Sequence, residues 1–421
     1  MKEGYKQTEI SVIPEDWEVA LFGEKSKIYR GGSPRPIQDY LTEADNGVNW
    51  IKIGDVSPDG KYITKTEERI RPEGISKSRE VHPGDFILSN SMSFGRPYIL
   101  SIDGCIHDGW LAIQDYRETF STEFLYYLLS SESVYKQQVA MAAGSSVKNL
   151  NKEKVSALLV CFPREKAEQH RIAEALSDVD DLIASLEKLI AKKKAIKQGA
   201  MQELLTGKRR LPGFSGEWKR KLFGDLFEIC PNNAYTRDQL TIGGKIKNIH
   251  YGDILTKYGA YLDGNIASIP TLGKTLEKKK YAEKAFVQDG DIIIADTAED
   301  LTVGKAVEIV NVSGKILSGQ HTFLCRPIIP FAPMYLGYYL NSADFHDQVV
   351  PYVTGTKVSS INKSSLCSLT VKYPDIPEQS AIAEILSDTD KAILALEERL
   401  AKAGQIKQGM MQQLLTGKIR L

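Results

Sequence analysis

The side chains best suited to recognition chemistry lie in polar loops between short apolar segments. In the stretch SNSMSFGRP, amide, hydroxyl and guanidinium groups follow one another closely, and such groups can hydrogen bond to base edges or phosphates. The candidate residues are Asn90, Ser91, Ser93 and Arg96, and Gly95 would permit the close approach of a ligand. The alternative is a hairpin tip that carries ordinary solvated polar residues.

A second polar loop, KIKNIHYGDILTKYG, lies in the other half of the chain. Its candidate contact residues are Lys247, Asn248, His250, Tyr251, Lys257 and Tyr258. Two short turns, GSSVKN and GTKVSS, place Lys148 and Lys357 beside small hydroxyl residues, a composition suited to phosphate. The overall charge weighs against a nucleic-acid ligand, because 54 basic residues balance 54 acidic residues and nucleic-acid binders usually carry a basic excess. Local patches must therefore supply any positive field.

None of the motifs that mark a self-sufficient enzyme occurs in the sequence. An adenine methyltransferase needs a Gly-rich loop for its methyl donor and an NPPY-like or DPPY-like turn, and the chain has neither. ASIPTLGKT ends like a phosphate-binding loop, but Ser268 stands where that loop requires its first glycine. Scattered carboxylates such as Asp291, Asp296 and Glu308 could imitate a nuclease site, although acidic residues at strand ends are common. We predict a non-catalytic protein.

The sequence also predicts neither a metal site nor a membrane segment. The five cysteines are far apart, and there is no CxxC or HExxH motif, so we interpret the cysteines as reduced core thiols. No run of about 18 apolar residues occurs, and the first residues lack the apolar core of a signal peptide. We expect a cytoplasmic location.

The elements that hold the polar loops are duplicated along the chain. KAIKQGAMQELLTGKRRL (194–211) returns as GQIKQGMMQQLLTGKIRL (404–421), and IAEALSD (172–178) returns as IAEILSD (382–388) at the same offset. The segments between them alternate short apolar runs with Gly, Pro and Asn turns, which indicates mixed α+β domains. HPGDFILSN and VQDGDIIIAD are predicted to be the same strand in two copies, followed by different loops.

The repeated C-terminal segments predict two long helices with an apolar seam. The seam residues recur at alternating steps of four and three, as in helices that wind around one another. They are Ile172, Leu176, Val179, Ile183, Leu186 and Ile190 in the first copy, and Ile382, Leu386, Ile393, Leu396 and Leu400 in the second, where the polar Thr389 takes the position between Leu386 and Ile393. Gly207 and Gly417 suit the left-handed residue past a helix end. Gly199 and Gly409, inside the helices, indicate either a close approach of another backbone or simple tolerance.

We therefore divide the chain into four segments. They are residues 1–164 (first globular domain), 165–211 (central long helix), 212–375 (second globular domain) and 376–421 (C-terminal long helix). The helices are nearly identical, which suggests that they do one job twice, such as binding two copies of the same partner. The globular domains share a plan but not their loops, which suggests related jobs on different targets.

Over its whole length the chain resembles the specificity subunit of Type I restriction-modification systems. The resemblance is carried by IPEDWE, PGDFILSNSMSFGRPYIL, HYGDILTKYG, DGDIIIADTAEDLTVGKA, the turns NLNKEKVSALLVCFP and SINKSSLCSLTVKYP, and both copies of LLTGK.RL. It implies an α+β fold with two target recognition domains in a pseudo-twofold arrangement. The domains would be joined by two long antiparallel helices packed as a coiled coil.

The resemblance also implies a function and a set of partners. Each recognition domain would read one half of a bipartite, non-palindromic double-stranded DNA site, and the helices would dock two adenine methyltransferase subunits, with restriction subunits joining the assembly. The chain itself would bind no cofactor. S-adenosylmethionine would belong to the methyltransferase subunits, and ATP with Mg to the restriction subunits. The alternative is a coiled-coil scaffold of another defence complex that does not bind DNA.

Overall fold

The computed structural model describes residues 4–57, 60–90, 95–142, 150–355 and 358–421. The chain forms two compact units, and one of them combines segments that are far apart in the sequence. Unit 1 comprises Met1–Glu187 and Arg399–Leu421, and unit 2 comprises Lys188–Glu398. Each unit thus contains one globular domain together with part of both long helices. The division of the chain into four consecutive segments stays a prediction.

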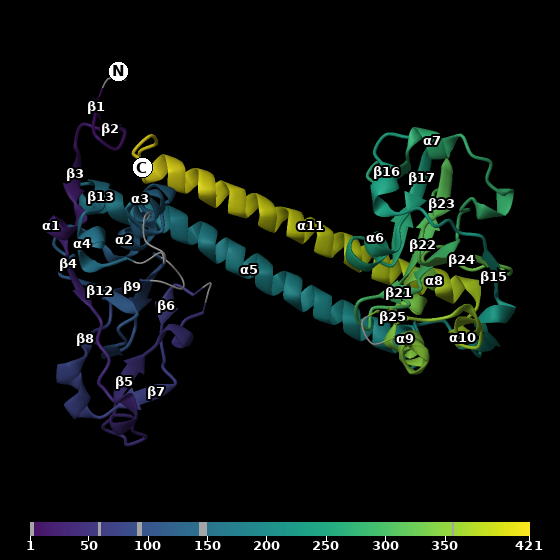
Figure 1. Cartoon of the computed structure of the whole chain (residues 1–421), viewed down its shortest axis with the longest axis horizontal. Coiled ribbons are helices and arrows are strands. Elements are labelled where there is room, and N and C mark those ends of the chain that lie inside the picture. The colour runs from purple at the N-terminus through teal and green to yellow at the C-terminus, as the bar shows by residue number, and fades with distance from the viewer. Residues whose placement is uncertain (1–3, 58–59, 91–94, 143–149, 356–357) are drawn as a thin grey trace. The chain divides into compact units, whose positions relative to one another are not determined.

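Unit 1 is a mixed α+β body with two main sheets (Figure 1). The five-stranded sheet has the order β4 (Lys27–Arg30), β12 (Trp110–Gln114), β9 (Phe86–Ser89), β10 (Pro97–Leu100) and β6 (Tyr62–Ile63). The four-stranded sheet has the order β7 (Glu68–Ile70), β5 (Val48–Ile51), β11 (Gly104–Ile106) and β8 (Arg79–Val81). Two further pairs join β1 (Tyr5–Gln7) to β2 (Val12–Pro14) and β3 (Trp17–Leu21) to β13 (Leu159–Pro163). The short helices are α1 (Phe22–Lys25), α2 (Thr122–Leu129), α3 (Glu132–Ala142) and α4 (Lys152–Ser156).

Unit 2 repeats the five-stranded sheet. Its order is β15 (Phe227–Cys230), β24 (Thr322–Pro327), β20 (Ile292–Ala295), β22 (Ala306–Val310) and β18 (Tyr261–Asp263). The second sheet has the order β16 (Leu240–Thr241), β19 (Thr271–Leu272), β17 (Ile246–Ile249) and β23 (Lys315–Ser318). Two pairs join β14 (Lys219–Leu222) to β26 (Thr370–Tyr373) and β21 (Thr297–Ala298) to β25 (Ser359–Ser360). The short helices are α6 (Tyr251–Thr256), α7 (Lys274–Glu277), α8 (Tyr335–Leu340), α9 (Ala343–Val349) and α10 (Lys363–Cys367).

The five-stranded sheets confirm that the two globular domains share one plan. In both, three antiparallel pairings are followed by one parallel pairing at the edge, β10 with β6 and β22 with β18. The predicted equivalence of the strands in HPGDFILSN and VQDGDIIIAD is also confirmed, because β9 and β20 both occupy the centre of the sheet. Both strands are buried along their whole length, since their sheets are covered on two faces.

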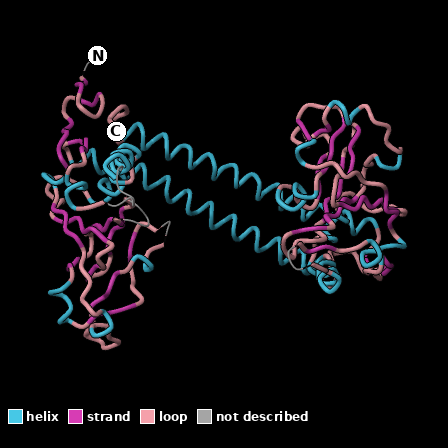
Figure 2. The backbone as a smooth tube through the Cα atoms, in the orientation of Figure 1, coloured by secondary structure: helices cyan, strands magenta, loops and turns pink. Residues whose placement is uncertain are grey.

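Two long helices, α5 (Lys166–Leu204) and α11 (Ile376–Leu414), each run for 39 residues without a break (Figure 2). In unit 2 they run antiparallel, because Lys194 pairs with Glu397 at 2.7 Å while Lys197 pairs with the earlier Asp390 at 2.6 Å. The predicted seam residues face inward. Buried are Ile172, Leu176, Leu186, Ile190, Ile382, Leu386, Ile393 and Leu396, and half-buried are Val179, Ile183 and Leu400.

The beginning of each seam packs into a globular core. Ile172 and Leu176 belong to the same hydrophobic cluster as Trp17 and Phe124 of unit 1, and Ile382 and Leu386 are in the corresponding cluster of unit 2. A polar contact repeated in both units ties the domain to both helices. Tyr127 donates to Asp180 at 2.8 Å and Lys407 pairs with the same carboxylate at 2.5 Å.

Unit 2 makes the same contact with Tyr338, Asp390 and Lys197, at 2.7 and 2.6 Å. In each unit a tyrosine of the globular domain, an aspartate of one long helix and a lysine of the other therefore meet at one point. The contact links the globular domain to one helix and that helix to the other. It therefore restrains the register of the two helices and the position of the domain on them.

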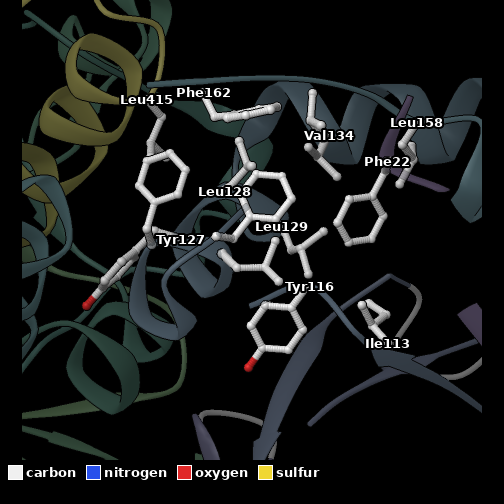
Figure 3. Packing of buried hydrophobic residues seen from close by; sticks show 14 of the residues in the cluster. Phe22, Ile113, Tyr116, Tyr127, Leu128, Leu129, Val134, Leu158, Phe162 and Leu415 are labelled. Carbon is white, nitrogen blue, oxygen red and sulfur yellow. The ribbon is translucent and has the colours of Figure 1, made fainter. Parts of the chain in front are cut away.

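The repeated phrase LLTGK.RL, which ends each long helix, docks into a globular domain. Leu414 and Leu415 are buried in the core of unit 1, where Figure 3 shows Leu415 in one cluster with Leu128 and Phe162. Leu204 and Leu205 are buried in the same way in unit 2. The left-handed conformations predicted for the glycines that follow are confirmed, with φ of +70° at Gly207 and +68° at Gly417.

The arginine of each phrase pairs with a buried glutamate in the first turn of the other long helix. Arg210 makes two bonds of 2.6 Å to Glu378 in unit 2. Arg420 holds Glu168 in the same bidentate way in unit 1 and also bonds Asp16. The near-identity of the two phrases therefore has an intramolecular cause, in addition to any role in binding a partner.

Candidate nucleic-acid interface

Three loops of unit 1 meet at Asn90, directly after strand β9. The Asn90 N–H donates to the Gly109 carbonyl at 3.2 Å, which joins the loop after β9 to the turn between β11 and β12. The Asn90 carbonyl accepts from the Leu150 N–H at 3.0 Å, which adds the segment leading into α4. Backbone hydrogen bonds thus gather segments that are about 20 to 60 residues apart in the sequence into one polar edge.

The same junction occurs in unit 2 at Asp296, directly after strand β20. The Asp296 N–H donates to the His321 carbonyl at 3.2 Å, and the Asp296 carbonyl accepts from Ile361 at 3.0 Å. The backbone plan is therefore identical in the two units. The side chains on it differ, since an amide in unit 1 is replaced by a carboxylate in unit 2.

The described candidates of the first half, Asn90 and Arg96, are buried or half-buried and make contacts within unit 1. Asn90 is only 8% exposed, and its amide donates to the Asp108 carbonyl at 3.2 Å. Arg96 is half-buried, with its guanidinium carbon 5.6 Å from the centre of the Tyr98 ring. Gly95 has a φ of +74°, and a Cβ there would collide with the Gln138 side chain, so an internal contact and not a ligand explains this glycine. Ser91 and Ser93 lie outside the described residues.

His250 and Tyr251 lie at the junction of unit 2. His250 precedes helix α6, and its Nδ1 accepts from the Gly252 N–H at 3.1 Å. Its ring lies 4.6 Å from that of Tyr251, which in turn contacts the His321 ring at 5.4 Å. Burial and the positive charge of Arg237 lower the pKa of His250. A neutral imidazole can keep accepting the Gly252 hydrogen bond at neutral pH.

The other four candidates of this loop are engaged within unit 2. Lys247 donates to the Gly264 carbonyl at 2.6 Å, and Lys257 pairs at 2.8 Å with Asp253, which also binds Arg237. Burial raises the pKa of Tyr258 to about 12. Asn248 is fully buried and accepts a 2.7 Å hydrogen bond from Asn233. The Asn248 side chain has no exposed surface in this structure, so the structure gives no support to its prediction as a contact residue.

The two lysines of the GSSVKN and GTKVSS turns, Lys148 and Lys357, lie outside the described residues. An asparagine a few residues after each lysine, Asn151 or Asn362, has a structural role. Asn151 accepts from the Lys154 N–H and Asn362 from the Ser365 N–H, both at 2.9 Å, so each asparagine caps the next short helix.

Sequence reasoning missed the turn that completes each junction. In unit 1 this turn holds His107 and Asp108. The Asp108 carboxylate contacts Ser33 and Arg35 from a distant loop, and His107 lies against the same carboxylate. In unit 2 it holds Gln320 and His321, and His321 has the left-handed φ of +54°. The sequence carried one usable signal, the Asp-Gly pair of HDGW between two apolar strands, which is typical of a tight turn.

Other classes of site find little support in the described part of the chain. No group of three or more His, Cys, Asp or Glu residues there could hold a metal ion. Its helices include none that is long and apolar enough to cross a membrane. The five cysteines are free, with Cys105, Cys161, Cys230 and Cys325 buried and Cys367 half-buried, as expected for reduced thiols in a protein core.

Comparisons with known proteins point to one family. Residues 14–198 and 215–405 each match the family described as Type I restriction modification DNA specificity domain. The chain is 22% identical to the Type I restriction enzyme MjaVIII specificity subunit of Methanocaldococcus jannaschii, over all of this chain and 97% of that protein.

Solved structures show the same fold. One, from work on complex assembly and conformational transition in a type I R-M system, has a TM-score of 0.60 at 18% identity and covers 97% of this chain and 99% of its own. The Type I restriction-modification S subunit from M. genitalium has a TM-score of 0.56 at 14% identity, covering 98% and 99%.

Proposed function

The chain belongs to the Type I restriction modification DNA specificity family, and on this premise we propose that its two recognition domains read the two halves of one bipartite double-stranded DNA site. The observation that supports this proposal is the repeated three-loop junction, at Asn90 in the first domain and at Asp296 in the second. Two domains that recognise different DNA sequences require a common backbone arrangement that carries different side chains. Since the side chains differ, the two half-sites are unrelated and the site is non-palindromic.

The proposed mechanism requires no bond-making by this chain. Each domain contributes base contacts, and a good bidentate contact discriminates against the wrong base by about 1–3 kcal/mol. Two half-sites read by one molecule add their discrimination, since a sequence that matches only one half loses the other set of contacts. Exposed cations near the junctions would add attraction to phosphates that is independent of sequence and weakened by salt.

The long helices are proposed to dock two adenine methyltransferase subunits. This proposal is supported by apolar side chains that remain exposed beside the seam. On α5 they are Leu182, Leu189 and Ile196, at seven-residue spacing and 41–54% exposed, and on α11 they include Leu394 and Ile406. A regular apolar stripe outside the seam is a surface that another helix can cover.

The remaining parts of the assembly follow from the same premise. Restriction subunits would join the complex, S-adenosylmethionine would be bound by the methyltransferase subunits, and ATP with Mg by the restriction subunits. The target adenine would enter the partner's pocket. We place the complex in the cytoplasm, where it can reach cellular and invading DNA.

A domain exchange tests the proposal. Residues 13–164 are replaced by the corresponding segment of another specificity subunit, and the methylated motif is determined by methylome sequencing of cells that carry the complete system. We expect one half of the motif to change and the other half to stay. A change in both halves would contradict independent reading, and the reciprocal exchange of residues 214–375 serves as the control.

A further inference from the structure

The turn between β11 and β12 carries a polar cluster centred on Asp108. Asp108 Oδ1 accepts from the Ser33 hydroxyl at 3.1 Å, and its Oδ2 lies 3.3 Å from Arg35 Nη2. His107 Nδ1 accepts from the Gly109 N–H at 2.9 Å, so the proton lies on Nε2, which is 3.0 Å from Asp108 Oδ1. The carboxylate is thus held from three sides.

The cluster is placed rigidly by the backbone around it. Gly31 donates to the Trp110 carbonyl at 2.9 Å and Gly32 to the Ile106 carbonyl at 3.1 Å, which pins the loop that carries Ser33 and Arg35 to the turn. A Cβ at Gly31 would collide with the His107 carbonyl, so only glycine allows this approach. The turn itself is bonded to Asn90, the residue where the three loops meet.

Arg35 differs from the arginines that stabilise the fold. Its side chain is 81% exposed and meets Asp108 through a single nitrogen, whereas Arg210 is 26% exposed and binds a buried glutamate through two. An exposed ion pair of this kind contributes little to stability. The pairing directs one nitrogen of the planar guanidinium at Asp108 and leaves most of the group facing solvent.

The surroundings of Arg35 favour a base edge over a phosphate. The cluster lines a cleft of about 810 Å³ together with Trp50, Lys52 and Glu68. Lys52 is paired with Glu68 at 2.9 Å, so two cations in the cleft are matched by two carboxylates. The matched charges leave no net positive field to attract a phosphate, whereas a G·C pair presents acceptors on guanine N7 and O6 for arginine and a donor on cytosine N4 for aspartate.

We propose that Arg35, oriented by Asp108, reads a guanine of a G·C pair in the half-site of the first recognition domain, with Asp108 accepting from cytosine N4. This inference rests on the proposed reading of DNA and names the residues and the base pair involved. The equivalent turn of the second domain holds Gln320 at the position of Asp108. This G·C contact therefore belongs to one half-site only.

The test compares the methylated motifs of complete systems that carry R35A, R35K or R71A. Arg71 is an exposed arginine of the same domain and is the control for loss of one positive charge. We expect R35A to lower the preference for guanine at one position of one half-site by roughly 10- to 100-fold, in line with the value of one bidentate contact. R35K keeps the positive charge but loses the two parallel N–H donors of the guanidinium, so it should weaken the preference for guanine at the same position. R71A should leave the motif unchanged.

Two results would overturn the inference. The first is an unchanged motif in R35A. The second is a uniform loss of methylation at all sites that R35K restores, because that pattern identifies a phosphate contact. Failure of the proposed function is a separate outcome, because in that case the unmodified system itself would methylate no bipartite motif.

Discussion

The carboxylates of Glu168 and Glu378 show how single side chains hold the recognition domains on the helices. Both are almost fully buried, and each is matched by an arginine from the repeated phrase, Arg420 and Arg210 respectively. Removing one partner of a buried pair leaves a charge without compensation, which costs more than the pair contributes.

We expect R210A to lower the free energy of unfolding of unit 2 by about 3 kcal/mol, the lower end of the range for a broken buried pair because Arg210 keeps some solvent contact. Calorimetric unfolding of the purified complex checks this. The double variant R210M/E378Q removes both charges and should be more stable than R210A. Equal stability of the two variants would show that the unpaired carboxylate is not the cause.

Glu308 gives the second domain a dependence on pH. Burial raises its pKa to about 7 from an ordinary 4.5, although the Met334 and Gly337 N–H groups bond the carboxylate and oppose the shift. Between pH 4.5 and 7 the folded state holds a proton that the unfolded state has lost. The free energy of unfolding therefore falls as pH rises through this window, by about 3 kcal/mol in all.

The variant E308Q should remove this pH dependence, because glutamine does not ionise. Thermal unfolding at pH 5 and pH 8 should show a larger drop for the unmodified protein than for E308Q. Parallel curves for the two proteins would show that Glu308 is not the titrating group.

At the scale of elements, the glycines of the long helices separate into two kinds. Gly207 and Gly417 end their helices with positive φ and pack against Trp218 and Trp17 at 3.3 Å from the position of a Cβ. Gly199 and Gly409 lie inside the helices, and apart from the adjacent residues and the backbone of the helix itself no described atom lies within 4 Å of the position of a Cβ. Among the described residues no other backbone approaches these two positions, so simple tolerance explains the internal glycines.

Opposite effects are expected from alanine at the two kinds of position. G199A should raise the free energy of unfolding by up to about 1 kcal/mol, because alanine is the better helix former. G207A should lower it by about 1–2 kcal/mol, because a left-handed conformation is costly for a residue with a Cβ. Urea unfolding of both variants provides the comparison. Destabilisation by G199A in the isolated chain would contradict the assignment.

At the scale of the whole molecule, the length of the helices matters as much as their sequence. A helix of 39 residues is about 58 Å long, and one turn of B-DNA rises about 34 Å. Because the helices are longer than one DNA turn, we expect them to be long enough to span the distance between two half-sites that lie one turn apart. The proposed site therefore contains an unread spacer, whose length should follow the length of the helices.

Inserting one heptad into each long helix, after Glu187 and after Glu398, tests this relation. The matched insertions keep the seam in register and add about 10 Å, close to the rise of three base pairs. We expect methylome sequencing to show the same two half-sites with a longer spacer. A heptad inserted into α5 alone breaks the register and is the control. An unchanged spacer after the matched insertions would refute the role of the helices as a ruler.

Periodicity and repetition are local properties, and they predicted much of the fold. The alternating steps of four and three predicted the seam from Ile172 to Ile190 because helical geometry places such residues on one face. The repeat predicted two domains of one plan, and Gly207 and Gly417 showed where the helices end. These features depend only on neighbours in the chain, so a single sequence displays them.

The site depended on contacts between distant residues, which no local pattern records. Arg35 meets Asp108 across 73 positions, and Arg420 meets Glu168 across 252. Asn248 looked like a surface residue because it lies in a polar run, but folding buried it beside Asn233. The sequence by itself determined the duplicated plan and the helices, since these follow from spacing. Only the tertiary structure decided which polar side chains face solvent together, because strand pairing and packing bring remote loops to one edge.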